Sequence, residues 1–593
     1  MMKRVLVFSF LVVLTVVSWG QTDARVVKAG AILDGFHEGA EEVERFLHLV
    51  YWTPADRDPA EGWEVRVPGV MEDIQEFYAD EMERHGFGRR TIRLQRGAAD
   101  KMVIHLVRGK GNKADYVKGD GERIASECEP VLRAAGIDPE RETVFFFCNL
   151  ADWEDEKFTH HSPYYGTGSW RRGRCWASDD IRQDIRNIVV KQKQVIDGEY
   201  GRMSLGRHVG IFIGGIAHEL GHAIGLPHNR ARGDESERGT ALMGAGNHTY
   251  RQERRHPEKK GAFLTLAHAM RLASHPMFSG STKAMQFDGG ATVKDEVVTV
   301  VGKSFLLSGK VQGKLPVYAV VGYMDPEGGG DYDAPTVVAV PDAEGHFSVS
   351  CDQLRAGRAG ELRLAVLHVN GANTVLRYPY VVGGDGVPDV SGIEDRTVML
   401  PFVDAIRSGG VGGAERALVE MADRRGADDR LVLLAEEVLA ARESGGSFDL
   451  GGAGVEVKRV RLGDVKPESG SVGWGRPSYN RVPMGQELIQ SGGKVFADGI
   501  YGHAPSRFVY RLDQGWRRLS GEAGLQDGKR GSVIFVVRVD GKEVWRSQRV
   551  TGGKRLKFDV DVVEAEELEL VVENAGDGNG ADWGMWLGVG LER

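Results

Sequence analysis

Cysteine is scarce in this sequence. The 593 residues include four cysteines, Cys128, Cys148, Cys175 and Cys351, three of them in the N-terminal third. So few thiols exclude a fold held by many disulfides, and they allow at most one bridge in that third, with its pairing open. An excess of one charge is also missing, since the net charge is −9. A polybasic surface is therefore not expected, and nucleic acid is not a predicted partner.

Long hydrophobic runs are missing except at the N-terminus. Lys3 and Arg4 precede an apolar run over residues 5–17, and Ser18, Trp19 and Gly20 follow it. This order is typical of a secretory signal peptide over residues 1–20, cleaved near Gly20. The run is too short for a membrane span, and no later run approaches about 20 apolar residues. We therefore expect a secreted protein, extracellular or periplasmic, without a membrane span.

The most informative segment covers residues 218–228, HELGHAIGLPH. At 3.6 residues per turn, His218 and His222 project from one face of a helix and can reach one metal ion. Gly225 permits the chain reversal through which His228 approaches the same ion. Three neutral imidazoles leave one tetrahedral position for water, as in catalytic zinc sites. The segment predicts a Zn²⁺ site with His218, His222 and His228 as ligands.

Glu219 follows the first of these histidines and lies about 100° from it around the helix. A carboxylate there can take a proton from zinc-activated water and pass it to a leaving amine. The predicted chemistry is attack on a carbonyl, most naturally that of a peptide bond. The alternative is a helix whose histidines are hydrogen-bonded core residues, which leaves Gly225 and His228 unexplained.

The segment resembles the metzincin signature of zinc metallopeptidases. The resemblance implies that His218, His222 and His228 bind zinc, that Glu219 is catalytic, and that Met243 forms a methionine turn beneath the metal. The sequence departs from the family in two places. Asn229 after the third histidine matches no one subfamily, and no tyrosine stands two residues after Met243. His248 or Tyr250 could substitute for that tyrosine, or both are ordinary loop residues.

The fold class expected is multidomain, beginning with an α/β (α+β) metzincin-like catalytic domain over residues 21–280. Strands are predicted at residues 46–52, 91–94, 102–107 and 144–148. Two helices are predicted as well. One buries Val70, Ile74, Phe77, Tyr78 and Met82 and ends at Gly86, and the other covers residues 263–273 before Pro276. Residues 159–175 form a loop that either borders the substrate cleft or is an ordinary long loop.

Two further regions precede the C-terminal domain. Residues 281–385 alternate polar and apolar side chains in short runs between Gly, Asp and Pro turns, which predicts an immunoglobulin-like β-sandwich. A spacer role is favoured for it over a binding role. Residues 386–447 have helical spacing, with Ala417, Leu418 and Met421 on one face, and are predicted to be a short helical connector.

Residues 448–593 have a β-pattern and contain the strings GKVFADGIYGHAPSRFVYRL and VENAGDGNGADWG. They resemble the NPCBM family, which implies a C-terminal carbohydrate-binding β-sandwich. Aromatic faces stack on sugars while polar side chains bond hydroxyls. The candidates for glycan contact are Trp474, His503, Asn579, Asp582 and Trp583, and each also has a structural explanation in the core or in a Gly-rich turn. The oxygens of Asp577, Asn579 and Asp582 could instead hold a structural Ca²⁺.

Three functions follow from these motifs. The first is a secreted zinc endopeptidase that the C-terminal module directs to glycoproteins or glycan-rich surfaces. The second is a glycan-binding surface or adhesion protein with an inactive peptidase fold, although intact Glu219 and three histidines argue against it. The third is a zinc hydrolase of a non-peptide amide, such as one on a sugar.

Overall fold

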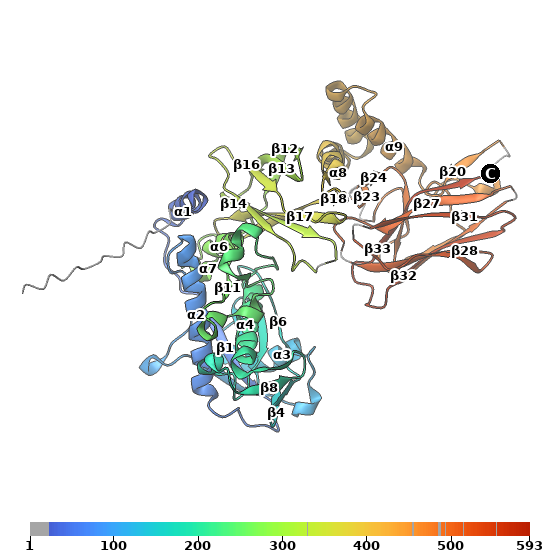
Figure 1. The fold of residues 1–593 in the computed structure, drawn as a ribbon. Helices are drawn as coiled ribbons and strands as arrows, with labels where there is room; N and C mark the ends of the chain where they lie inside the picture. Colours follow the sequence, from blue (N-terminus) through green and yellow to red (C-terminus); the bar gives the residue numbers. More distant parts are fainter. Residues whose placement is uncertain are drawn as a thin grey trace, which may run out of the picture.

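The computed structural model of the chain describes residues 23–593 except 329, 453–455, 484–487, 493, 514, 530 and 553. The predicted signal peptide lies outside the described residues. Figure 1 shows an N-terminal domain (residues 23–280, blue to green), a middle domain (281–390), a helical connector (391–447) and a C-terminal module (448–593, orange to red). The expected multidomain organisation and the C-terminal β-sandwich are confirmed. None of the described helices is long and apolar enough to cross a membrane.

A five-stranded sheet forms the centre of the N-terminal domain. Its order is β2-β1-β3-β7-β6, with β6 antiparallel at one edge and the other four strands parallel. The strands are β1 (Leu47–Thr53), β2 (Ile104–Arg108), β3 (Thr143–Cys148), β6 (Tyr165–Gly168) and β7 (Gly173–Ser178). Every residue of β1 and β3 is buried, as in parallel strands covered on both faces.

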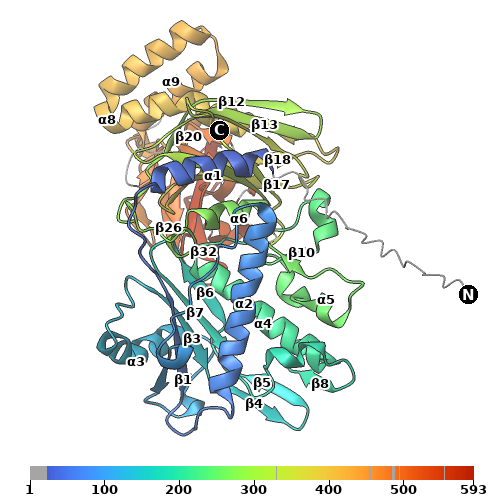
Figure 2. The same cartoon turned by 90° about the vertical axis from the view of Figure 1, so that its left-hand side faces the viewer.

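Helices cover both faces of this sheet. The helix α3 (Gly121–Ala134) packs against Val50, Val144 and Phe146, whereas α2 (Trp63–His85) and α4 (Leu205–Ala223) pack against Leu49, Tyr51 and other residues of the opposite face. Figure 2 shows α2 and α4 side by side. The predicted apolar face of α2 is buried, and Gly86 ends the helix with a left-handed φ of 95°.

Sequence reasoning missed some elements of this domain. The predicted strand at residues 91–94 is wrong, since only Leu94 pairs, in an isolated bridge to Leu47. The helices α1 (Ala24–His37) and α3 were not predicted. The predicted helix at 263–273 begins later, as α6 (Leu266–Ala273), and Pro276 starts α7 (Pro276–Ser279). The remaining elements are β4 (Ala151–Glu154), β5 (Lys157–His160), β8 (Gln194–Asp197), β9 (Gly201–Ser204), β10 (Thr240–Ala241), α5 (Gln252–Arg255) and β11 (Ala262–Phe263).

Glycines let the β6–β7 hairpin lie directly on α4. A Cβ on Gly166 would stand 1.9 Å from the carbonyl oxygen of Glu219, and one on Gly173 would stand 1.9 Å from that of Ala223. Only glycine permits so close an approach of two backbones. These contacts fix the position of α4, which contains residues 218–222, relative to the edge of the sheet.

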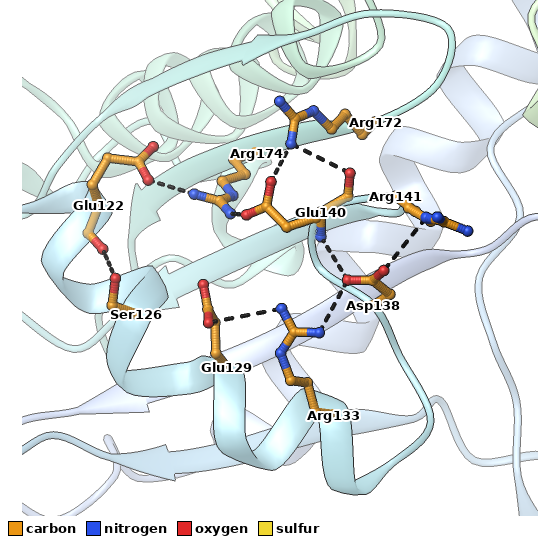
Figure 3. A network of polar contacts seen from close by, with 9 residues as sticks. All are labelled: Glu122, Ser126, Glu129, Arg133, Asp138, Glu140, Arg141, Arg172 and Arg174. Atoms are coloured by element: carbon orange, nitrogen blue, oxygen red, sulfur yellow. Dashed lines mark hydrogen bonds and ion pairs between the residues drawn. The ribbon is translucent and has the colours of Figure 1, made fainter. Parts of the chain in front are cut away.

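An ion-pair network ties the outer side of this hairpin to its neighbours (Figure 3). Arg174 on β7 pairs with Glu122 of α3 and with Glu140, and Arg172 also pairs with Glu140. Arg133 of α3 contacts Asp138 at 3.2 Å. Single exposed pairs contribute little to stability, but shared partners make this a network that joins α3 to the hairpin.

The middle domain is a β-sandwich, as its pattern predicts. One sheet has the order β12-β13-β16 and the other β15-β14-β17-β18-β19. Their strands are β12 (Thr292–Val301), β13 (Ser304–Gln312), β14 (Val317–Pro326), β15 (Thr336–Ala339), β16 (His346–Cys351), β17 (Ala359–His368), β18 (Asn373–Val382) and β19 (Pro388–Asp389). Phe305, Leu307, Val320 and Leu364 meet between the sheets.

The outer face of the larger sheet packs on the N-terminal domain. Tyr318, Val321, Tyr323 and Leu367 belong to the same buried cluster as residues of α2, α4 and α6. The helix α1 also joins the two domains, because the Arg25 Nη1 donates to the Val338 oxygen at 3.3 Å and His37 Nε2 lies 2.9 Å from the Val369 oxygen. The N-terminal and middle domains therefore share one hydrophobic core.

The connector consists of α8 (Ser391–Arg425), kinked at Gly410, and α9 (Arg430–Ser444).

The C-terminal module is built from two sheets and a hairpin. One sheet has the order β22-β25-β33-β27-β31, with β20 beside β33. The other has the order β21-β26-β32-β28-β29, with β30 beside β28, and β23 and β24 form the hairpin. Its strands are β20 (Arg459–Arg461), β21 (Ser469–Ser471), β22 (Ser478–Tyr479), β23 (Ile489–Ser491), β24 (Lys494–Phe496), β25 (Gly499–His503), β26 (Ser506–Arg511), β27 (Arg518–Leu525), β28 (Ser532–Val539), β29 (Lys542–Arg546), β30 (Val550–Thr551), β31 (Arg555–Asp561), β32 (Glu567–Asn574) and β33 (Trp583–Glu592).

Candidate metal centre

The three histidines of the motif converge. His218 and His222 lie one turn apart on α4, and His228 follows the turn at Gly225, whose φ is 85°. One ring nitrogen from each histidine lies within 4.8 Å of the other two. The structure thus brings together the three predicted ligands.

The Nδ1 atom of each histidine is the outer ring nitrogen, which points away from the cluster, and each has a hydrogen-bond acceptor. His218 Nδ1 donates to the Leu242 oxygen at 2.8 Å, His222 Nδ1 to the Leu226 oxygen at 2.8 Å, and His228 Nδ1 to Asp331 Oδ1 at 2.7 Å. A neutral imidazole that donates through Nδ1 has a bare lone pair at Nε2, which is the form that binds a metal. All three inner nitrogens are therefore available as ligands.

The inner nitrogens also test whether a metal fits. His222 Nε2 and His228 Nε2 lie 2.9 Å apart. With both Nδ1 atoms donating elsewhere, either a shared proton or a bound cation stabilises two ring nitrogens at that distance. Burial lowers the pKa of His218 to about 3, and burial and then the nearby His228 lower the pKa of His222, so these rings are neutral at ordinary pH. Three imidazole nitrogens at this spacing match the ligand set of a catalytic Zn²⁺ site.

Glu219 lies beside this cluster in a cleft. Burial raises the pKa of its carboxyl to about 7, and a hydrogen bond from the Gly166 backbone partly offsets the effect. A carboxyl that exchanges its proton near neutral pH suits general acid–base chemistry. The cleft has a volume of about 680 Å³ and is lined by His218, Glu219, Tyr164, Tyr200, His248 and Tyr332 among others.

Met243 lies beneath the helix and is fully buried. A Cβ on Gly221 would stand 2.4 Å from the Met243 sulfur, so the thioether occupies the space that this glycine leaves open. The preceding residue, Leu242, supplies the carbonyl that holds His218. This turn therefore supports the first ligand through its backbone while Met243 packs against α4.

The two departures from the metzincin signature have structural explanations. Asn229 is buried and its Nδ2 donates to Thr265 Oγ1 at 2.7 Å, so it anchors the turn after His228 to the start of α6. Tyr250 is buried and its hydroxyl donates to Asp73 at 2.8 Å, away from the cleft. Of the two possible substitutes for the missing tyrosine, only His248 lines the cleft.

The segment at residues 159–175 does border the cleft, which was one of its two predicted roles. His160, Tyr164 and Tyr165 line the cavity, and the Tyr164 hydroxyl donates to the Phe212 oxygen of α4 at 2.6 Å. The later part of the segment serves other purposes. Trp170 Nε1 donates to the Met285 oxygen at the border of the middle domain, and Arg172 and Arg174 belong to the ion-pair network.

Two residues of the centre come from the middle domain, and sequence reasoning missed both. Asp331 and Tyr332 lie in the loop between β14 and β15, and the Tyr332 ring stacks on His228 with centroids 3.6 Å apart. The string GGGDYD between two apolar runs was the available signal, because a Gly-rich loop with an aromatic residue between two acids is unusual for a plain strand connection. A spacer role alone therefore does not describe the middle domain.

The glycan candidates of the module differ in exposure, although the ring of Trp474 lies 6.1 Å from that of His503. The Trp474 side chain is 45 % exposed and its ring lies 5.3 Å from that of Trp583. His503 and Asp582 are buried; His503 Nδ1 lies 2.9 Å from the Ala504 oxygen, and Asp582 Oδ1 accepts from the Ser532 amide at 2.9 Å. Asn579 is exposed in the preceding turn. Only the two tryptophans offer an accessible aromatic surface.

The acids proposed for Ca²⁺ have other partners. Asp577 accepts from the Ser532 hydroxyl at 2.8 Å and pairs with Arg549 at 2.5 Å. Across the described ranges, groups of three metal-binding side chains comprise the histidine cluster and the exposed set Asp342, Glu344 and His346. The Ca²⁺ site at Asp577, Asn579 and Asp582 stays a prediction, and its two carboxylates have protein hydrogen-bond donors as partners. All four cysteines are buried and unpaired.

Residues 458–592 match the NPCBM/NEW2 domain. The family predicted for the module is therefore confirmed.

No curated protein matches the chain. Among solved structures, OgpA of Akkermansia muciniphila is 27 % identical over 58 % of this chain and 95 % of its own, with a TM-score of 0.48. OgpA has also been solved with an O-glycopeptide substrate. The CBM51 of a Clostridium perfringens GH95 protein, solved with methyl-galactose, is 26 % identical over 22 % of this chain and 99 % of its own, with a TM-score of 0.22.

Proposed function

We propose that this protein is a secreted, zinc-dependent endopeptidase of metzincin type, directed to glycoproteins by its C-terminal module. The observation that carries the proposal is the convergence of three imidazoles beside a half-buried carboxyl in an open cleft. His218, His222 and His228 would hold the ion, and each has its outer nitrogen already bonded. Bound zinc supplies Lewis-acid activation of water and of the scissile carbonyl.

The protein's own residues have separate tasks in this reaction. Glu219 accepts the proton of the attacking water on its carboxylate and then donates it to the leaving nitrogen of the peptide. Its position in the cleft favours both proton transfers, because burial raises the pKa of the carboxyl to about 7, close to a neutral working pH. The aromatic side chains of the cleft, Tyr164 and Tyr200 among them, exclude water from the bound peptide.

The glycoprotein substrate is inferred from the module. The match to NPCBM/NEW2 and the contact of exposed Trp474 with half-buried Trp583 support a surface that stacks on sugars. Such a module raises the local concentration of the enzyme on a glycan-bearing substrate without a change in the chemistry. The predicted leader at residues 1–20 agrees with this extracellular setting.

The test uses the full mature chain, its Glu219→Gln variant and a panel of glycoproteins, each with and without a chelator. We expect the native chain to bind one zinc ion by mass spectrometry and to cleave peptide bonds. Glu219→Gln should keep the zinc and lose about 10²–10⁴-fold in rate, because the amide cannot accept the proton.

Each other outcome contradicts part of the proposal. Equal cleavage by Glu219→Gln, or cleavage that a chelator leaves unchanged, would exclude this mechanism. Zinc binding without cleavage of any protein would favour the adhesion function. Release of acetate or ammonia from amino sugars, without peptide cleavage, would favour a non-peptide amide hydrolase.

A further inference from the structure

The loop between β14 and β15 of the middle domain reaches across to the metal centre. Asp331 bonds the third ligand, and Tyr332 covers the ring of that ligand. We propose that the middle domain completes the metal site, with Asp331 as the positioning residue for His228 and Tyr332 as its cap. The inference rests on the proposed function only in that the three histidines bind zinc.

The third ligand needs an outside support more than the first two do. His218 and His222 are fixed by α4, and their Nδ1 atoms donate to backbone oxygens of the same domain. His228 lies beyond the end of the helix, and its Nδ1 partner is a side chain 103 residues later in the sequence. The direction of its inner nitrogen therefore depends on where the middle domain places Asp331.

Asp331 is itself held in place. Its second oxygen, Oδ2, accepts from Arg363 Nη1 of β17 at 2.7 Å, and Arg363 is 6 % exposed. Arg363 also lies 3.6 Å from Asp325 of β14. One carboxylate oxygen thus faces the ligand and the other faces a buried cation, which is the arrangement by which outer partners orient metal-binding imidazoles.

The backbone of the loop also shows a constraint. Asp331 has a φ of 63°, a left-handed conformation that is uncommon for residues other than glycine, asparagine and aspartate. The Arg230 amide, two residues after His228, donates to the Ala334 oxygen at 2.9 Å. Arg232 forms two bonds of 2.9 Å with Asp352 of the same sandwich. The chain after His228 and the loop are therefore bound side by side.

Tyr332 covers the solvent side of the ligand. Its ring lies at 26° to that of His228 with centroids 3.6 Å apart, and it is 49 % exposed on the cleft side. Stacked rings shield each other from water, and here the shield lies over the one ligand that is beyond the end of α4. We expect the ring, without its hydroxyl, to be sufficient for this role.

The test measures zinc binding by the full chain in competition with a chromogenic chelator, with no substrate present. Asp331→Asn suits the left-handed backbone but removes the charge and turns an amide towards Arg363. We expect zinc affinity to fall about 10–100-fold, as when other outer partners of metal ligands are changed. Tyr332→Ala should release zinc faster, whereas Tyr332→Phe should not.

Asp333→Asn is the matched control. This residue lies in the same loop and pairs with Arg355, not with a ligand, so its change should leave zinc affinity unaltered. Unchanged affinity in Asp331→Asn, or an equal loss in Asp333→Asn, would overturn the inference. A native chain that binds zinc tightly yet cleaves no protein would refute the proposed function and leave this result intact.

Discussion

The two β-sandwiches of this protein look similar in sequence but differ in what they pack against. The larger sheet of the middle domain has Val320 and Leu364 on one face, inside the sandwich, and Val321 and Leu367 on the other, inside the core of the N-terminal domain. The module closes around its own cluster, which includes Phe508, Leu519, Phe535, Leu570 and Trp586. The first sandwich shares the core of the domain that contains the histidine cluster, whereas the second has a core of its own.

The border of the module is more polar than that of the middle domain. A cavity of about 980 Å³ separates the module from the middle domain and α8, and Glu361, Arg396, Gln490 and Lys529 are among its lining residues. Buried apolar contact between module and connector includes Leu488, Val495 and Ala497, near the β23-β24 hairpin, against α8 and α9. Polar borders of this kind join domains less firmly than a shared core does.

Truncation should give the largest difference between the two sandwiches. We expect a chain ending at Ser444 to fold, bind zinc and cleave an unglycosylated peptide, while it loses retention on immobilised glycoprotein. A chain ending at Met285 should fail to fold, because it exposes the apolar surface that Tyr318, Val321 and Leu367 cover. Circular dichroism melting curves and zinc content would measure both. A stable, zinc-binding chain ending at Met285 would contradict the shared core.

The second largest difference is expected in acid stability, which should fall more steeply for the N-terminal domain than for the module. Burial lowers the pKa of His85 and His160 to about 4 and that of His275 to about 3, all in the N-terminal domain. The unfolded chain takes up protons near pH 6.5 while the folded chain does not, so stability falls as pH falls from about 6.5 towards 4. Each histidine contributes up to about 1.4 kcal/mol per pH unit. The module contains one histidine, His503, so we expect its stability to depend less on pH in this range.

Calorimetry of zinc-free protein between pH 7.5 and 5.5 would measure this difference as two transitions. Glu219, whose raised pKa has the opposite sign, is replaced by glutamine in the chain used. His275→Asn should make the pH dependence of the N-terminal transition shallower. Equal shifts of both transitions would show that the histidines do not account for acid sensitivity.

The smallest effect is expected where the two sandwiches touch. Glu327, at the base of the metal-site loop, accepts from Thr551 Oγ1 at 3.2 Å and lies 3.5 Å from Lys554 Nζ. Glu327→Gln should lower the stability of the module by no more than about 1 kcal/mol and leave zinc affinity unchanged. Calorimetry and chelator competition would test both. A clear loss of zinc affinity would mean that the module braces the loop.

Local patterns predicted α2 and both sandwiches but not α3, although Ile124, Cys128 and Leu132 form one buried face of that helix. The apolar spacing of Val70, Ile74 and Met82 and the stop at Gly86 located α2, and the alternating runs located both sandwiches. The strand predicted at residues 91–94 does not form, because a short apolar run becomes a strand only where a neighbouring strand pairs along it. Here a single bridge forms. The helix α1 was missed because its buried residues, Val26, Ala29 and Leu33, face a partner surface that lies in another domain.

Local sequence was enough to predict His218, His222 and His228 as zinc ligands, because the spacing of the motif is a property of one helix and one turn. It also identified the family of the module, which residues 458–592 match. The packing of the folded chain revealed that Asp331 and Tyr332 stand beside His228 and that His503 and Asp582 are buried. The physical reason is distance along the chain: local geometry follows from neighbouring residues, whereas contacts between domains depend on how whole apolar faces pack together.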